Sequence, residues 1–140
     1  MEFNFDIVQV PYSVFDRRFE KYFDVLKNRN VEIQARSVFL QGLAFLKFDD
    51  LPLQLQGAKP QLEYLQKVAD ERQASIEALC LRFVLSNSFI DKVVIGVDSL
   101  TQLKKNVAGI ENLGSIGDMQ DKLANAEIEQ EDILLPYKWG

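Results

Sequence analysis

Three short segments rich in β-branched residues recur along the chain, and a helical pattern follows each of them. The segments are residues 7–10, 31–37 and 92–95. Parallel strands need a crossover connection that is usually a helix, so strands that alternate with helices indicate parallel βα units. We therefore predict an α/β fold with three parallel strands. Such a thin sheet has two unpaired edges, which predicts self-association or a missing part of the sheet.

The second and third strands predict different surroundings. In residues 31–37 apolar and polar positions alternate, and the polar residues that share one face are Glu32, Gln34 and Arg36. That polar face could line solvent, a partner or the interior of a barrel. Residues 92–95 instead contain the continuous apolar run Val93-Val94-Ile95. Such a run is typical of a strand that is buried on both faces.

Between the first two strands, the spacing predicts a helix over residues 15–26, with Ser13 as its cap. Its charged residues are expected to form a solvated face, comprising Asp16, Arg17, Arg18, Glu20 and Lys21. Residues 38–59 contain Gly42, Pro52 and Gly57 and are predicted to form a loop.

Four further helices are predicted in the rest of the chain. One begins at Pro60, because proline suits the first helical turn. The next follows a Ser75 cap, and the others cover residues 100–107 and 119–126.

Composition restricts the chemistry that the chain can perform alone. The chain has 140 residues, no histidine and one cysteine, Cys80. The absence of histidine excludes Ser-His-Asp and Cys-His nucleophile arrangements and removes the commonest transition-metal ligand. A single cysteine allows no intramolecular disulfide and no multi-cysteine metal site, so no metal site is predicted. Cys80 lies on an apolar helix stripe and is expected to be a buried thiol.

The charge balance argues against two classes of partner. Lys plus Arg number 16 and Asp plus Glu number 21, which gives a formal charge of −5. An acidic chain is a poor candidate for binding nucleic acid or an anionic membrane. No run approaches the roughly 18–20 apolar residues of a membrane span. The first residues do not resemble a signal peptide. A cytoplasmic location is therefore expected.

The turn after the third strand is one candidate binding site. Gly96 permits close approach of a ligand, and Asp98 or Ser99 can cap the helix that follows. A helix N-terminus suits a phosphate group, and Lys104 and Lys105 could add positive charge, whereas Asp98 would repel it. The alternative is an ordinary capped helix without a ligand.

A second candidate site is the end of the second strand, where Arg36 and Ser37 are followed by Phe39, Gln41 and Gly42. In parallel βα proteins, ligands bind at the carboxyl ends of the strands. The alternative is that Arg36 is simply solvated. Within the first strand, the Gln9 amide could point into a site or be satisfied by the backbone.

Three motifs in sequence resemble the C-terminal half of an aldo/keto reductase. They are Gln9-Val10-Pro11-Tyr12, Ala35-Arg36-Ser37-Val38-Phe39-Leu40-Gln41-Gly42 and Val94-Ile95-Gly96-Val97-Asp98-Ser99-Leu100-Thr101-Gln102-Leu103-Lys104-Lys105-Asn106. The resemblance covers roughly residues 5–107 and extends loosely to the tail. It implies a partial TIM (β/α)8 barrel, made of the last three βα units with parallel strands. The whole chain, residues 1–140, would then be a single partial domain.

The resemblance also assigns cofactor contacts by position. It implies that Gln9 binds the nicotinamide carboxamide. The pyrophosphate and ribose contacts would be Ser37, Phe39 and Gln41. The adenosine phosphate and adenine contacts would be Gly96, Asp98, Gln102 and Asn106. Arg36 stands where many members stack an aromatic residue on the nicotinamide, and Gln102 stands where many have arginine. NADP is the cofactor that the family implies, with Lys104 or Lys105 as compensating cations, and this chain alone is expected to bind it weakly or not at all.

The family's catalytic tetrad of Asp, Tyr, Lys and His belongs to earlier strands, and this chain contains no matching residues. A complete TIM barrel takes about 250 residues. We therefore expect the C-terminal portion of an NADP-dependent carbonyl reductase, inactive alone, with a small carbonyl compound as the substrate of the intact enzyme. Its partner would be the missing N-terminal half or another copy of itself. The alternative is a non-catalytic module that binds a dinucleotide or assembles subunits.

Overall fold

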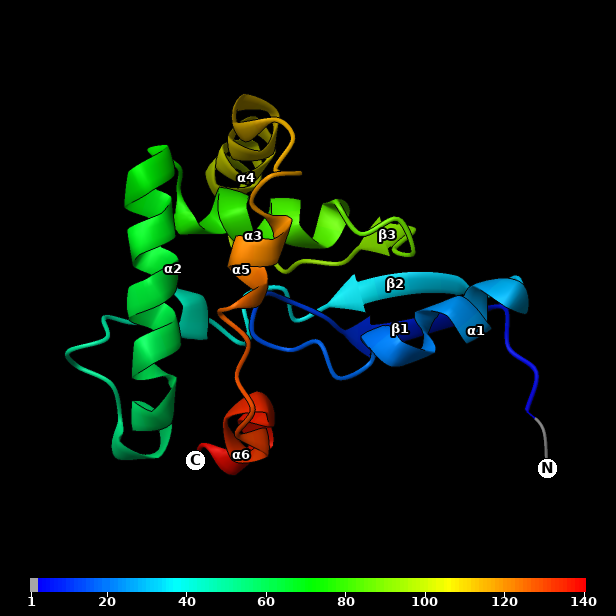
Figure 1. Cartoon of the computed structure of the whole chain (residues 1–140), viewed down its shortest axis with the longest axis horizontal. Coiled ribbons are helices and arrows are strands. Elements are labelled where there is room, and N and C mark those ends of the chain that lie inside the picture. Colours follow the sequence, from blue (N-terminus) through cyan, green and yellow to red (C-terminus); the bar gives the residue numbers. More distant parts are fainter. Residues whose placement is uncertain (1–2) are drawn as a thin grey trace.

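The three predicted strands form one parallel sheet in the order β1-β2-β3 (Figure 1). They are β1 (Ile7–Pro11), β2 (Glu32–Arg36) and β3 (Lys92–Val93). The structure is a computed structural model, and it describes residues 3–140. β1 and β2 agree with the prediction to within a residue or two at each end. The parallel arrangement is therefore confirmed.

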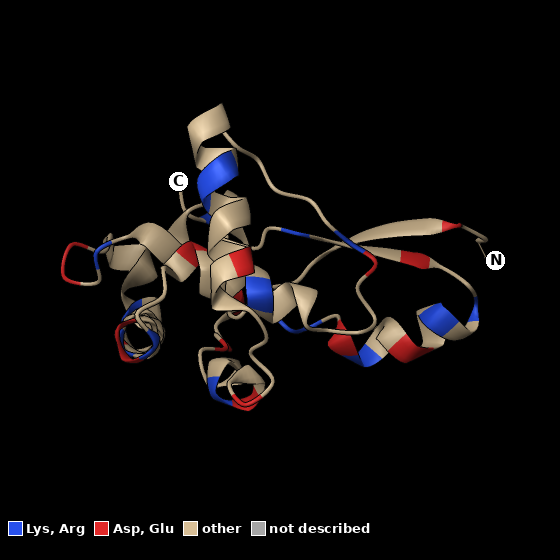
Figure 2. Ribbon diagram, turned by 90° about the horizontal axis from the view of Figure 1, so that it is seen from above, with Lys and Arg blue, Asp and Glu red and all other residues tan. Residues whose placement is uncertain are grey.

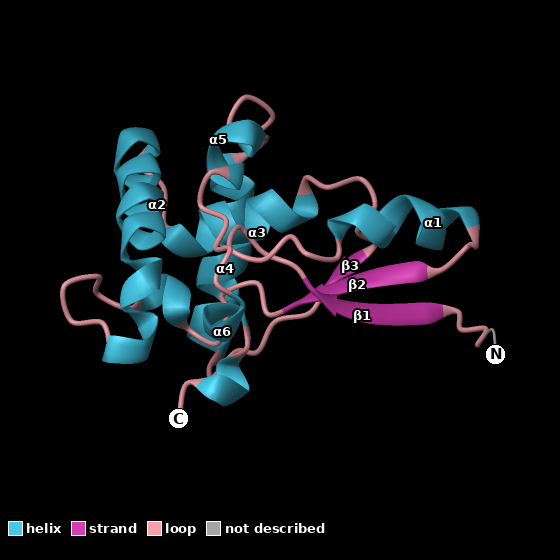
Figure 3. Cartoon of the chain, turned by 60° about the horizontal axis from the view of Figure 1, so that its bottom comes forward, coloured by secondary structure: helices cyan, strands magenta, loops and turns pink. Residues whose placement is uncertain are grey.

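Helices pack on one face of the sheet. α1 (Phe23–Asn28) contacts β2, and α3 (Ile76–Leu85) contacts β3 (Figure 3). The side chains that point toward these helices are buried, as in Ile33 and Ala35 of β2. Alternate residues of the same strands point the other way and remain partly or fully exposed. The sheet thus has one closed face and one open face.

The remaining helices lie beyond the carboxyl ends of the strands (Figure 1). They are α2 (Lys59–Arg72), α4 (Leu100–Leu113), α5 (Gln120–Ala124) and α6 (Glu131–Leu134). Short 3-10 turns complete the structure, at η1 (Glu20–Tyr22), η2 (Leu43–Phe45), η3 (Leu53–Ala58) and η4 (Pro136–Lys138). Acidic and basic residues are interspersed along the helices (Figure 2).

Two helix starts follow the predicted caps. The Ser75 hydroxyl oxygen accepts a hydrogen bond from the Ala78 N–H at 3.1 Å, at the start of α3. The Ser99 hydroxyl oxygen accepts one from the Gln102 N–H at 3.1 Å, at the start of α4. Serine is effective here because its oxygen satisfies a backbone N–H that has no partner within the helix.

The helix predicted over residues 15–26 is wrong in its first half. The chain runs as an irregular loop from Tyr12 to Phe19, followed by η1 and then α1. Ser13 accepts hydrogen bonds from the N–H groups of Phe15 and Asp16, but these close a turn instead of a helix. Because a side chain satisfies these backbone groups locally, they do not need a helix.

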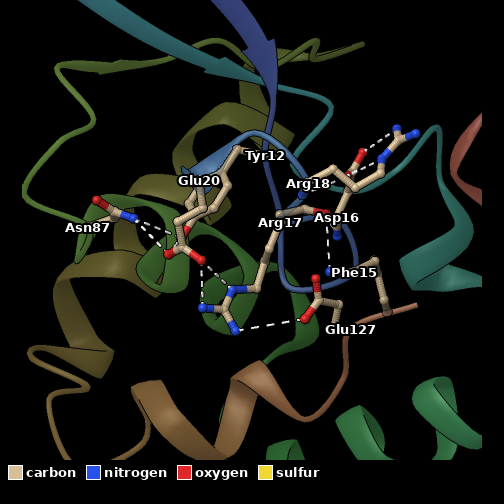
Figure 4. Close-up of polar contacts among 9 residues, drawn as sticks. Tyr12, Phe15, Asp16, Arg17, Arg18, Glu20, Asn87 and Glu127 are labelled. Carbon is tan, nitrogen blue, oxygen red and sulfur yellow. Dashed lines mark hydrogen bonds and ion pairs between the residues drawn. The ribbon is translucent and has the colours of Figure 1, made fainter. Parts of the chain in front are cut away.

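The charged residues of this loop do not form the solvated helix face that the sequence predicts. Asp16 is 1% exposed, and Arg18 donates two hydrogen bonds of 2.9 Å to its carboxylate (Figure 4). Arg17 pairs with Glu20, which also accepts a hydrogen bond of 3.0 Å from the Tyr12 hydroxyl. A carboxylate buried as deeply as that of Asp16 needs such partners, so these charged contacts stabilise the loop conformation.

Tyr12 connects this polar network to the core. Its ring centroid lies 5.2 Å from that of Phe23 and 5.8 Å from that of Phe83. Its hydroxyl accepts a hydrogen bond of 2.8 Å from the Asn87 side chain (Figure 4). Burial raises the pKa of the Tyr12 hydroxyl well above its ordinary value, and it raises the pKa of the buried Cys80 thiol as well. Cys80 is thus the buried thiol that the sequence predicts.

The structure changes several other boundaries. β3 is shorter than predicted, and Val94 is 41% exposed where burial on both faces was expected. Nothing within residues 3–140 covers the open face beside it. Residues 38–59 contain two 3-10 turns instead of an unbroken loop, and α4 continues six residues beyond the predicted end at Val107. α5 is shorter than the predicted segment 119–126.

Among the described residues, no helix is long and apolar enough to cross a membrane. Residues 3–140 also contain no cluster of three or more Cys, Asp or Glu side chains that could hold a metal ion.

Candidate functional site

A cavity of ≈ 610 Å³ lies at the carboxyl ends of β2 and β3. Its volume is within the range of sites for small molecules and cofactors. The loop after β2 forms one wall and the turn before α4 forms the other. The lining includes seven residues that the sequence singled out, namely Arg36, Ser37, Phe39, Gln41, Gly96, Asp98 and Gln102. The fold therefore unites the two candidate sites.

The wall that follows β2 has an unusual backbone. Three non-glycine residues have positive φ angles, with Ser37 at 59°, Leu40 at 44° and Gln41 at 53°. Gly42 follows at 86°. Left-handed conformations cost non-glycine residues about 1–2 kcal/mol each, so the surrounding structure must hold them in place. Strain of this kind gathers at binding and active sites, which makes this loop a candidate for function.

The same loop contains backbone N–H donors without a backbone partner. The N–H groups of Val38, Phe39 and Gln41 donate no hydrogen bond to another backbone group in the described part of the chain, and all three residues line the cavity. Successive backbone N–H groups in mixed right- and left-handed conformations form concave sites for anions. This wall therefore suits a phosphate or pyrophosphate group.

The opposite wall is the start of α4. Gly96 has open space where a Cβ would stand. The Asp98 N–H donates a hydrogen bond of 2.8 Å to Oε1 of Gln102, while Ser99 supplies the cap. The carboxylate of Asp98 takes no part in capping, although the sequence left that role open. Asp98 is exposed and is one of the residues that line the cavity.

The charges around the cavity are asymmetric. Arg36 is its one cationic residue and Asp98 its one anionic residue among those that line it. Neither Lys104 nor Lys105 lines the cavity. Lys105 instead forms an ion pair of 2.9 Å with Glu77. Burial is the largest single influence and opposes ionisation of Glu77, but the hydrogen bond and charge of Lys105 together with hydrogen bonds from a backbone N–H and from Ser75 outweigh it, so the Glu77 pKa lies below its ordinary value.

Two of the nine predicted site residues lie outside the cavity lining. Gln9 is on the open face of the sheet, where its Nε2 donates a hydrogen bond of 2.8 Å to Oε1 of Gln34. Asn106 lies one turn after Gln102 on α4 and is 3% exposed, and its Nδ2 has no partner among the described residues. A buried amide without a partner costs free energy, so the Asn106 amide is left unsatisfied by the described residues.

Sequence reasoning missed Val38 and the left-handed backbone at Leu40. No side-chain pattern announces them, because backbone N–H groups act whatever the residue type. The one available signal was Gly42, which the sequence marked as a turn residue. A glycine beside polar residues at a strand end could have suggested a loop with left-handed backbone.

Comparisons with known proteins agree with this geometry. The sequence model of the aldo/keto reductase family matches residues 1–121. L-galactose dehydrogenase from Arabidopsis thaliana is 30% identical over 131 residues, which are 91% of this chain and 39% of that protein.

Solved structures share the fold. Aldo-keto reductase AKR11C1 from Bacillus halodurans, in its apo form, superposes with a TM-score of 0.69 at 21% identity. The match covers 91% of this chain and 46% of that one. The holo form of the same protein gives a TM-score of 0.68 with the same coverage and identity. This chain thus spans less than half the length of the relatives it matches, and it belongs to the aldo/keto reductase family.

Proposed function

We propose that this chain is the dinucleotide-binding portion of a carbonyl reductase that transfers hydride from a nicotinamide cofactor. The cavity of ≈ 610 Å³ at the strand ends is the observation that supports the proposal most strongly. Its unpaired backbone donors and Arg36 suit a pyrophosphate, and the unpartnered amide of Asn106 suits a nucleobase. The bound cofactor would supply the hydride.

The three βα units would form part of a TIM barrel, with the open face of the sheet toward the interior. That face carries a hydrogen-bonded row that crosses all three strands. Gln9 donates to Gln34 at 2.8 Å, Gln34 donates to Glu32 at 2.5 Å, and Lys92 donates to Glu32 at 3.0 Å. Such pairing satisfies polar groups before they are covered, which suits a face enclosed by further strands.

Both edges of the sheet present surfaces that further βα units would cover. An apolar stripe on α4, the helix that follows β3, is exposed and consists of Leu100, Leu103 and Val107. Near the other end of the chain, Ile7 of β1 is exposed, as are Tyr22 and Val25 in the segment of η1 and α1 that follows β1. We call these two surfaces the β3 seam and the β1 seam. The proposed partner is a complementary set of βα units, from a longer polypeptide or from another copy, in the cytoplasm.

The chain alone should not reduce carbonyl compounds. Reduction by hydride transfer needs a proton donor at the carbonyl oxygen. The Tyr12 hydroxyl is unsuitable, because it is buried and already bonded to Glu20 and Asn87. This chain therefore binds and orients the cofactor, and the complementary part supplies the acid.

Binding and reduction should be measured separately. The ¹⁵N-labelled chain is titrated with NAD⁺ or NADP⁺ to millimolar concentration, and shifts are expected at residues 37–42, 96–102 and 106. Reduction of an aldehyde panel by NADH or NADPH is then followed by absorbance, and no turnover is expected. Absence of shifts in a folded sample would overturn the binding role, whereas turnover by the chain alone would overturn the assignment of catalysis to its partner.

The exposed seams favour a second candidate function, a module that assembles subunits without binding a cofactor. This alternative predicts concentration-dependent association together with an unoccupied cavity in the titration. Sedimentation velocity beside the titration separates the two functions, because association without dinucleotide binding would favour the assembly module.

A further inference from the structure

The charge distribution of the cavity bears on which dinucleotide it accepts, an inference that rests on the proposed function. NAD and NADP differ only by a phosphate on the 2′ oxygen of the adenosine ribose. That phosphate carries a charge of about −1.5 to −2 at neutral pH. Discrimination between the two cofactors therefore depends on the charge beside this ribose.

The wall formed by residues 37–42 is the anion-binding side of the cavity. It has the unpaired N–H groups of Val38, Phe39 and Gln41, with Arg36 at its start. These groups fit a pyrophosphate, which both cofactors share. The α4 wall lies opposite and would then contact the adenosine part, where Asn106 lacks a partner for its buried Nδ2.

Asp98 gives the α4 wall a negative charge, and its carboxylate forms no hydrogen bond or ion pair with the described residues. Ser99 caps the helix, and Asp98 contributes only its backbone N–H to Gln102. Within residues 3–140, no Lys or Arg forms an ion pair with the Asp98 carboxylate. Its two oxygens are therefore available as hydrogen-bond acceptors on a residue that lines the cavity.

No cation on this wall compensates for that charge. Lys105 is held by Glu77 at 2.9 Å, and Lys104 does not line the cavity. Gln102 is neutral, and its Oε1 already accepts from the Asp98 N–H. A phosphate on the ribose would thus meet a carboxylate and an amide.

We infer that Asp98 makes the site select NAD(H) over NADP(H), by accepting hydrogen bonds from the free 2′ and 3′ hydroxyls and by repelling a 2′-phosphate. A carboxylate pairs well with a vicinal diol, because each oxygen can accept one O–H. Acidic residues bind the ribose 2′-hydroxyl of NAD in the same way in other dinucleotide folds. This cofactor differs from the NADP that the family resemblance implies.

The test compares NAD⁺ with NADP⁺ in titrations of the full chain, followed by ¹⁵N shifts at moderate ionic strength. Dissociation constants are expected to favour NAD⁺ by about tenfold or more, from repulsion between Asp98 and the phosphate. Asp98→Asn keeps the shape but removes the charge, so the variant should bind NADP⁺ more tightly than the native chain does. A gain of binding cannot arise from misfolding.

Glu111→Gln is the matched control. Glu111 lies on α4, is exposed and is not among the residues that line the cavity. Its loss of charge should therefore leave the ratio of the NAD⁺ and NADP⁺ dissociation constants unchanged. The inference is overturned if the native chain binds NADP⁺ as tightly as NAD⁺, or if both substitutions shift the ratio equally. If a folded chain binds neither dinucleotide, the proposed function fails first, and selection at Asp98 fails with it.

Discussion

The two faces of the sheet are built from alternate residues of the same strands, but their environments are opposite. Ile33 is 0% exposed under the helices, whereas Ile7, also in a strand, is 54% exposed. The closed face has an aromatic and aliphatic core, and the open face has a row of hydrogen-bonded polar residues. The closed face can stabilise the chain by itself, while the open face and the seams are suited to further units.

The largest expected effect comes from Ile33→Ala on the closed face. Removing a buried side chain from a packed core costs about 2–5 kcal/mol. Ile7→Ala on the open face should cost about 0.5 kcal/mol or less, because that side chain is already in water. Urea unfolding followed by circular dichroism measures both. Equal losses of unfolding free energy in Ile33→Ala and Ile7→Ala would mean that the two faces do not differ in solution.

Tyr12→Phe should have the next largest effect. The substitution keeps the aromatic packing but removes the hydroxyl that joins Glu20 and Asn87. Leaving those two groups without their partner should lower the free energy of unfolding by about 1–3 kcal/mol. A matched control is Tyr137→Phe, because Tyr137 is exposed. A loss no greater than that of the control would show that the network does not stabilise the closed side.

Tyr12 also predicts a dependence on alkaline pH. Burial raises the pKa of its hydroxyl above the ordinary value, which is about 10. A group with a raised pKa contributes stability that is present below its unfolded pKa and is lost as the pH rises toward the folded pKa. The free energy of unfolding should therefore fall above about pH 10, and more steeply in the native chain than in Tyr12→Phe. If the free energy of unfolding falls with pH at the same slope in the native chain and in Tyr12→Phe, the prediction is wrong.

Leu103→Glu tests the β3 seam, and its effect should be on association instead of stability. The side chain is exposed, so the free energy of unfolding should change by about 0.5 kcal/mol or less. A charge within the apolar stripe should weaken self-association or docking of complementary βα units, as measured by sedimentation velocity. Leu53→Glu places the same charge at another exposed leucine, outside both seams. If Leu103→Glu and Leu53→Glu weaken association equally, the β3 seam is not a specific docking surface.

The smallest expected effect concerns Glu32 on the open face. Hydrogen bonds from Gln34 and then from Lys92 hold the pKa of Glu32 below its ordinary value. Lys92→Met should therefore raise this pKa toward about 4.3, as measured by ¹³C NMR of the carboxyl group. Lys138→Met, which removes a lysine paired with Asp132, should leave it unchanged. An unchanged pKa in Lys92→Met would mean that the polar row is not formed in solution.

Local patterns predicted much of this fold. The alternation in residues 31–37 identified β2 and the residues on each of its faces, and Ser75 and Ser99 marked two helix starts. These signals are local, because a strand exposes alternate residues and a cap bonds to N–H groups two or three residues away. Strand-end and helix-start signals pointed to most of the predicted site residues, the family resemblance added Gln102 and Asn106, and the cavity lining includes seven of the nine.

Where the sequence prediction failed, side-chain contacts or the absence of neighbouring segments had overridden the periodic pattern. The spacing of Phe15 and Phe19 is helical, but Asp16 and Tyr12 are held by Arg18, Glu20 and Asn87 in another arrangement. The apolar run at Val94 predicted burial on both faces, but burial depends on neighbours that the described part of the chain does not contain. Periodicity shows neither the polar partners of Asp16 and Tyr12 nor the absence of neighbours beside Val94.

The sequence by itself determined the parallel βα order, the polar face of β2, the helix caps and the lack of histidine chemistry. Only the tertiary structure decided that the ends of β2 and β3 share one cavity, that Lys105 is paired with Glu77, and that Asp98 lines the cavity without an ion-pair partner among the described residues. Strand and cap patterns depend on residues a few positions apart. The charge of a binding site depends on which side chains from distant segments come within a few ångströms, and that is fixed only when the helices pack on the sheet.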